Sequence, residues 1–173
     1  MTMSEWDRNL YEDPCRECGF SWSISQADAA SLVASIPMRY SELLDGRDAS
    51  LRHPDLSWPV GAYVCHVADN MRIWAERLAG LALGATDPID PYDQDDLARV
   101  RNYSRVPLEA GLWSLRHAVA DWRDAVELAT DRQVVMEHPE RGSLSVLEVV
   151  RSIAHDAHHH AWDIQRSIDR SGA

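Results

Sequence analysis

The chain has 173 residues, 45% of them hydrophobic, a length that suits one globular domain with its own core. Its 28 acidic against 17 basic residues give a formal net charge of -11, which argues against a nucleic-acid partner. No run approaches the roughly 18 apolar residues of a membrane-spanning helix, and the polar N-terminus lacks the apolar segment of a signal peptide. We therefore expect a cytoplasmic protein with no membrane attachment.

Four segments carry apolar residues that recur every three or four positions, as in the amphipathic helices of a bundle. The first is expected at residues 25–44, where Ser25 and Asp28 form a capping box. Pro37 should kink or interrupt this helix. The second helix should begin near Pro59, because proline is favoured in the first turn.

A polar stretch at residues 85–103, rich in proline and aspartate, follows the second helix. It predicts a long crossover that could roof a pocket, with a short helix at residues 97–100. The third helix should start near Pro107. The fourth opens with another capping box, formed by Ser145 and Glu148. No strand is expected.

These elements predict an all-α fold, a four-helix bundle at residues 25–170 with a long crossover between its second and third helices. Residues 1–24 precede it as an N-terminal extension. The apolar stripe of the fourth helix narrows to Ala154, Ala157 and Ala161, which lets a neighbouring helix or a ligand approach closely. We expect an interior site beside these alanines.

The fourth helix also holds four of the eight histidines of the chain. His155 and His159 stand four residues apart on one helical face, so their rings can bind one metal ion. The facing second helix offers one histidine, His66, as a third ligand. Three imidazoles with open coordination positions would form a catalytic metal site. The alternative is a solvated histidine face, favoured near a helix C-terminus by the helix dipole.

Other polar and aromatic residues are candidates for supporting roles. Asp69, Asn70 and Asp156 could hold the ring N–H groups of the ligands and fix their tautomers. Trp162 follows the two histidines along one ridge of the helix and could wall the pocket. Arg166, one turn later, could bind an anionic substrate or a thiol cofactor, although a surface salt bridge is the alternative.

Cys15 and Cys18 form a CxxC pair that could be half of a zinc site, a redox dithiol or two ordinary thiols. A structural Zn²⁺ needs four ligands, so His53, His138 or a second subunit would have to complete it. No helical pattern follows the pair to lower a thiol pKa, which favours a structural role, or none, over a redox one. Cys65 is interpreted as a core residue. Three cysteines do not form a secreted disulfide framework, so we expect reduced thiols.

Several segments of the chain resemble the DinB/YfiT-like superfamily of metal-dependent four-helix-bundle proteins, which includes mycothiol-dependent maleylpyruvate isomerase. The segments are CRECGF at 15–20, WPVGAYVCHVADN at 58–70 and HPERGSLSVLEVVRSIAHDAHHHAWDI at 138–164. In that family a histidine from the second helix and an HxxxH pair from the fourth bind a divalent metal. The resemblance implies that His66, His155 and His159 do so here.

Family members with known activity bind a low-molecular-weight thiol, such as mycothiol or bacillithiol, and transfer it to or through an electrophilic substrate. A coordinated cation lowers the thiol pKa and so supplies the nucleophile. The resemblance implies a thiol S-transferase or isomerase, with Zn²⁺ favoured and Ni or Fe as alternatives. A metal-dependent hydrolase and a non-catalytic bundle, acting as a sensor or dimerisation module, stay open. A homodimer would be ordinary for such a bundle.

Overall fold

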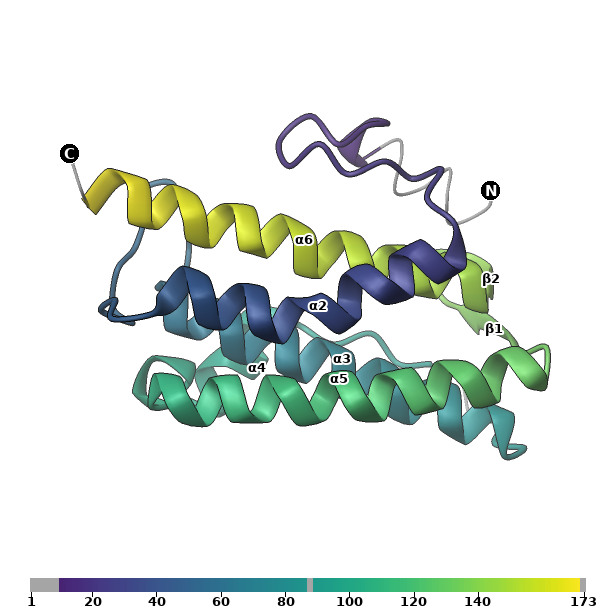
Figure 1. The fold of residues 1–173 in the computed structure, drawn as a ribbon. Helices are drawn as coiled ribbons and strands as arrows, with labels where there is room; N and C mark the ends of the chain where they lie inside the picture. The colour runs from purple at the N-terminus through teal and green to yellow at the C-terminus, as the bar shows by residue number, and fades with distance from the viewer. Residues whose placement is uncertain (1–9, 87–88, 172–173) are drawn as a thin grey trace.

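A computed structural model describes residues 10–86 and 89–171, so the first nine residues of the expected N-terminal extension lie outside the described chain. The four long helices are α2 (Gln26–Leu44), α3 (Val60–Ala82), α5 (Leu108–Asp131) and α6 (Val146–Ser171). They run side by side, which confirms the predicted four-helix bundle (Figure 1). No described helix combines the length and apolarity needed to span a lipid bilayer.

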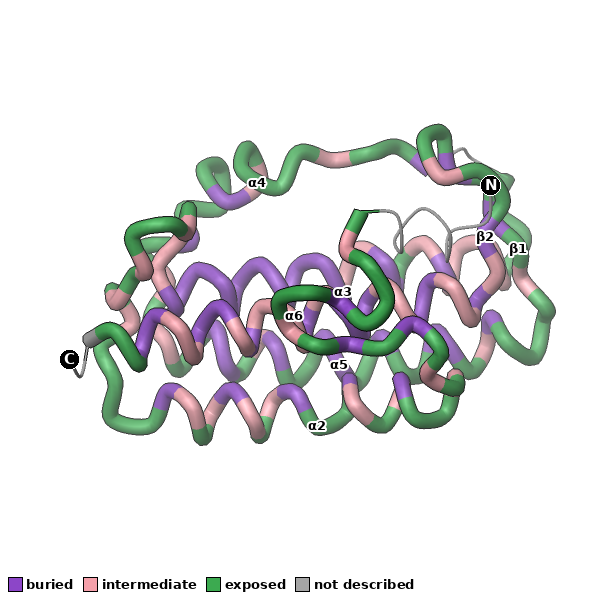
Figure 2. Tube along the Cα trace, turned by 90° about the horizontal axis from the view of Figure 1, so that it is seen from above, coloured by how far each residue is buried: buried purple, intermediate pink, exposed green. Residues whose placement is uncertain are grey.

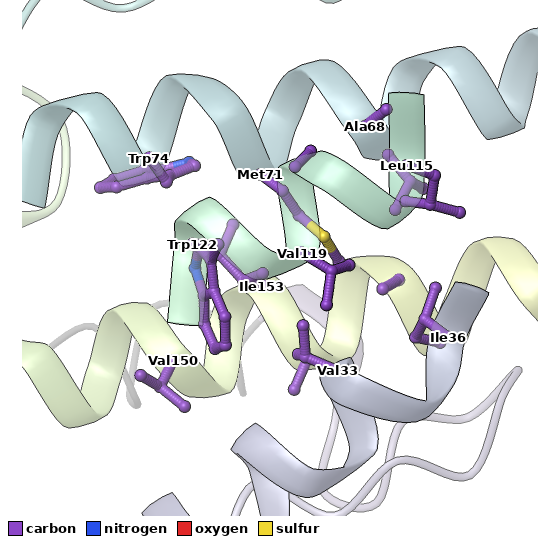
Figure 3. Close-up of a cluster of buried hydrophobic side chains, with 14 of the residues drawn as sticks. Val33, Ile36, Ala68, Met71, Trp74, Leu115, Val119, Trp122, Val150 and Ile153 are labelled. Carbon is purple, nitrogen blue, oxygen red and sulfur yellow. The ribbon is translucent and has the colours of Figure 1, made fainter. Parts of the chain in front are cut away.

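The core lies between the four helices, with α3 packed mainly against α5 and α2 mainly against α6. Figure 3 shows side chains from all four helices meeting there, among them Ile36, Met71, Leu115, Trp122 and Ile153. Each of these five is no more than 2% exposed. Burial of an aliphatic side chain of this size contributes about 1.5–3 kcal/mol, so such contacts dominate the stability of the bundle.

Both predicted capping boxes are present. At the start of α2, the Ser25 hydroxyl accepts from the Asp28 N–H at 3.1 Å and donates to its carboxylate at 2.7 Å. At the start of α6, the Ser145 N–H donates to the Glu148 carboxylate at 2.7 Å. These bonds satisfy backbone donors that a helix start otherwise leaves without partners.

Pro37 does not interrupt α2, contrary to one of the two outcomes expected from the sequence. A proline inside a helix removes one donor and crowds the carbonyl four residues earlier, here that of Val33. Ile36 and Tyr40 flank it and are fully buried, and the Tyr40 hydroxyl donates to the Ala157 carbonyl of α6 at 2.8 Å. Packing against α6 therefore holds α2 helical through the proline.

A short antiparallel hairpin precedes α6, whereas the sequence predicted no strand. It consists of β1 (Val135–His138) and β2 (Gly142–Ser145). Met136 and Leu144 are paired across it and are at most 1% exposed, so they anchor it on the core. Strands of four residues are too short for alternation to distinguish them from a loop, which explains why the prediction was wrong.

Two connecting segments shape the surface of the bundle. The crossover between α3 and α5 contains α4 (Gln94–Val100), which starts earlier than the short helix expected there, and the 3₁₀ helix η1 (Tyr103–Arg105). Residues 10–24 lie outside the bundle against α6, as the two views in Figures 1 and 2 show. These two segments cover the part of the molecule where the polar clusters described below are found.

Leu115→Ala should lower the free energy of unfolding by about 2–5 kcal/mol, because it leaves a cavity at a fully buried position. Urea unfolding followed by circular dichroism measures the loss. Leu83→Ala is the matched control, because Leu83 is 77% exposed and its truncation should change stability by no more than about 0.5 kcal/mol. Equal effects of the two substitutions would contradict the assignment of the core.

Candidate metal centres

Helix α6 presents potential ligands on two faces, because successive residues of an α-helix point about 100° apart. One group, here called the cavity cluster, is His66, Asp156 and His160. The other, called the cysteine cluster, is Cys15, Cys18, His155 and His159. Within each cluster the ligand atoms lie within 4.8 Å of one another. The three histidines predicted as one metal site are thus divided between two clusters.

The cavity cluster has the spacing of a metal site. Asp156 Oδ1 lies 3.6 Å from His66 Nε2 and 3.5 Å from His160 Nε2. Ligand atoms at about 2.1 Å from a shared ion are themselves roughly 3.0–3.4 Å apart. His66 Nε2 is buried and has no hydrogen-bond partner among the described residues, which costs roughly 1–3 kcal/mol. A divalent cation would satisfy this nitrogen, so the residues present fit a metal.

Hydrogen bonds hold two of these ligands from outside the cluster. The second oxygen of Asp156 accepts from the Asn70 amide at 2.9 Å, and the Asn70 carbonyl accepts from the Tyr92 hydroxyl at 2.9 Å. His160 Nδ1 lies 3.0 Å from an Asp163 carboxylate oxygen. Such outer partners fix the orientation of metal ligands. Asn70 occupies the supporting position expected from the sequence, whereas Asp156 lies among the candidate ligands themselves.

Asp69, also expected to support the ligands, lies in a different network. It accepts from the Tyr103 hydroxyl at 2.6 Å and pairs with Arg101 at 3.0 Å and with Arg72. These contacts tie α3 to the crossover and to η1. Asp69 makes none of its described hydrogen bonds or ion pairs with the histidines of either cluster.

Trp162 and Arg166 lie beside the cysteine cluster. The Trp162 ring centroid is 5.4 Å from that of His159, and the Arg166 guanidinium lies 4.4 Å from the Trp162 ring centroid. Arg166 also approaches Asp163 at 3.7 Å, the kind of ion pair weighed as its alternative role. Neither side chain lines the cavity beside the cavity cluster. The expected contact with a substrate or thiol is therefore not found there.

The charges of Asp156 and His160 support each other. Burial alone would raise the pKa of Asp156, but the nearby rings of His160 and His66 outweigh it and hold that pKa well below its usual range. Burial alone would lower the pKa of His160, but Asp156 and Asp163 raise it to about 9. Without metal the pair is therefore a carboxylate beside an imidazolium.

A cavity of about 230 Å³ opens beside the cavity cluster. Its lining residues are Tyr11, His66, Asn70, Trp74, Arg77, Pro91, Tyr92, Gln94, His138, Glu140, Arg141, Ser152, Ile153, His155 and Asp156. Pro91, Tyr92 and Gln94 belong to the crossover, which roofs the pocket as expected. Arg77 and Arg141 supply positive charge to a protein that is acidic overall.

His138 lines this cavity as a neutral hydrogen-bond donor. Its Nδ1 accepts from the Glu140 N–H at 3.2 Å, which places the ring proton on Nε2. Burial lowers the pKa of His138, and Arg141 and Arg77 lower it further, so the ring stays neutral. The sequence suggested His138 only as a zinc ligand for the cysteine pair. Its place in the cavity depends on the hairpin, which the sequence did not predict.

In the cysteine cluster, the N-terminal CxxC pair meets the predicted HxxxH pair of α6. Cys15 Sγ lies 3.8 Å from His159 Nδ1. Burial, together with the proximity of Cys15, raises the pKa of Cys18 to about 12. His53, suggested as a further ligand, instead uses its backbone N–H to bind the Ser167 hydroxyl at 3.2 Å.

Comparison with known proteins gives a family and a fold. The model of the DinB superfamily matches residues 34–164. A search of curated proteins found no match. Among solved structures, the chain is similar to YfiT from Bacillus subtilis, described as a probable metal-dependent hydrolase with an unusual four-helix bundle topology. The two share 20% sequence identity over 87% of this chain and 91% of YfiT, with a TM-score of 0.75.

The charge pairing predicts that Asp156→Asn lowers the pKa of His160 from its wild-type value of about 9. The substitution removes one of the two negative charges that stabilise the imidazolium against burial and leaves that of Asp163 in place. Ring-proton NMR of the metal-free protein across a pH series measures this shift. Asp124→Asn, on the exposed face of α5, is the control and should leave the titration of His160 unchanged. An unshifted pKa in Asp156→Asn would contradict the pairing.

Proposed function

The chain belongs to the DinB superfamily, and from this premise we propose that it is a metal-dependent enzyme whose ion is held by His66, Asp156 and His160. The main support for this proposal is that the ligand atoms of these three residues converge beside a cavity. Imidazole and carboxylate ligands suit Zn²⁺, with Ni or Fe as alternatives. A divalent cation bound there acts as a Lewis acid and lowers the pKa of a thiol or water in the cavity.

The proposed nucleophile is a low-molecular-weight thiol, which attacks an electrophilic substrate in an S-transfer or isomerisation reaction. Arg77 and Arg141 line the cavity, so an anionic group on the thiol or on the electrophile has two cations to bind. His138 offers a ring N–H to a polar substrate atom. The three free cysteines fit a reducing cytoplasm, where such thiols are abundant.

A hydrolase is the second candidate, because the structurally similar YfiT is described as a probable metal-dependent hydrolase. At 20% identity that likeness supports a shared fold rather than a shared reaction. The two functions differ in whether turnover requires a thiol. A metal- or ligand-binding bundle without catalysis would show no turnover, either with or without a thiol.

His66→Ala should lose one equivalent of bound metal together with thiol-dependent turnover, because α3 supplies no other ring to the cavity cluster. Elemental analysis of the untagged protein measures the metal, and mass spectrometry of products from a panel of thiols and electrophiles measures turnover. His117→Ala, on the exposed face of α5, is the control. Full metal content in His66→Ala would refute the ligand set, and turnover without thiol would favour the hydrolase.

Arg141→Ala should raise the KM for an anionic substrate roughly 10- to 100-fold, since a hydrogen bond to a charged group contributes about 1.5–3 kcal/mol. Metal content should not change, because Arg141 is not among the proposed ligands. Arg123→Ala, which removes an exposed arginine of α5, is the matched control for the change in net charge. If the wild type, Arg141→Ala and Arg123→Ala had the same KM, Arg141 would not contact the substrate.

A further inference from the structure

The cysteine cluster shares no ligand with the cavity cluster and has a different donor set, although its His155 also lines the cavity. We propose that Cys15, Cys18, His155 and His159 bind a structural Zn²⁺ that fixes the segment 10–24 onto α6. Two of these ligands come from the N-terminal segment and two from the helix. One ion would therefore cross-link distant parts of the chain, since Cys15 and His159 are 144 residues apart in the sequence.

The spacing of the ligand atoms supports this proposal. All four lie within 4.8 Å of one another, and Cys15 Sγ is 3.8 Å from His159 Nδ1. In a tetrahedral site with Zn–S near 2.3 Å and Zn–N near 2.0–2.1 Å, a sulfur and a nitrogen are about 3.6 Å apart. The Cys15–His159 pair therefore needs a contraction of only about 0.2 Å to bind the ion. Two thiolates also balance its charge, which lowers the cost of burying it.

The loop that carries the cysteines is shaped to turn both sulfurs toward α6. Gly19 follows Cys18 with a φ of +74°, a left-handed conformation that glycine adopts without strain. Its N–H donates to the Cys15 carbonyl at 2.8 Å, and the Cys15 N–H donates to the Phe20 carbonyl at 2.8 Å.

The histidine side of the cluster is held from outside as well. His159 Nε2 lies 3.4 Å from a Glu17 carboxylate oxygen, which leaves Nδ1 directed at Cys15. A carboxylate on the far ring nitrogen is the usual second partner of a zinc-bound histidine. The neighbouring His158 lies 3.1 Å from the Cys18 carbonyl through Nε2 and 3.1 Å from Arg39 Nη1 through Nδ1. These contacts position the loop through the His158 side chain, which is not one of the four proposed ligands.

Two of the four proposed ligands, Cys15 and His155, are buried, and the other two, Cys18 and His159, are partly buried. Cys15 is 2% and His155 5% exposed. The rings of Tyr11, Phe20 and Trp22 surround His155, with centroids at 4.5, 5.3 and 4.6 Å from its ring. Structural zinc sites have four protein ligands and no open position, whereas catalytic ones keep a position for water or substrate. The cysteine cluster matches the first kind and the cavity cluster the second.

The proposed ion would also shape the catalytic cavity. Tyr11 belongs to the N-terminal segment, packs on His155 and lines the cavity beside the cavity cluster. Fixing the segment therefore fixes part of the cavity wall. The DinB superfamily model matches residues 34–164, so both cysteines lie outside the matched region. The structural ion is thus inferred for this chain from its own residues.

Metal content and cobalt spectroscopy of the full, untagged chain test this proposal. We expect two equivalents of zinc in the wild type and one in Cys18→Ser. After replacement of zinc by Co²⁺, a thiolate-to-cobalt charge-transfer band should be present in the wild type and absent in Cys18→Ser. Cys65→Ala is the matched control, because Cys65 lies on α3 outside both clusters, and it should keep both equivalents and the band.

His66→Ala separates this proposal from the proposed function, because it should lose one equivalent yet keep the thiolate band. The wild type alone gives a test that does not depend on the folding of a variant. Titration of its thiols with an organomercurial should release one equivalent of zinc to a metallochromic indicator. Full zinc content in Cys18→Ser, cobalt protein without the band, or a Cys15–Cys18 disulfide in place of zinc would overturn the structural ion.

Discussion

The rotational setting of α6 determines which side chains can share a metal ion. Ala154, Ala157 and Ala161 are completely buried, and the Tyr40 hydroxyl of α2 binds the Ala157 carbonyl at 2.8 Å. With the alanine face against the core, Asp156 and His160 turn toward α3, and the residue one position earlier in each turn faces the N-terminal segment. Two adjacent pairs with the same four-residue spacing thus acquire different partners.

Much of the fold could be predicted from the sequence, because the signals are local. Apolar periodicity located the four helices, and Ser25 and Ser145 marked two of their starts. The hairpin was missed because each strand has only four residues. Its absence from the prediction also hid the cavity role of His138, which depends on where the hairpin lies relative to α3.

The structure groups the candidate ligands differently from the sequence prediction. His66 and an i, i+4 pair on the fourth helix were recognisable, yet that spacing fits Asp156 with His160 as well as His155 with His159. Periodicity does not set the rotation of a helix to within one residue, so only packing decides between them. The partners of the cysteine pair are also set by the tertiary fold, since they come from the other end of the chain.

In the proposed arrangement, α6 supplies ligands to two separate ions. Anomalous diffraction at the zinc absorption edge, on crystals of the untagged protein, tests it most directly. We expect two peaks per chain, one among His66, Asp156 and His160 and the other among the four ligands of the cysteine cluster. A single peak coordinated by His66, His155 and His159 would contradict it and restore the grouping first predicted from the sequence.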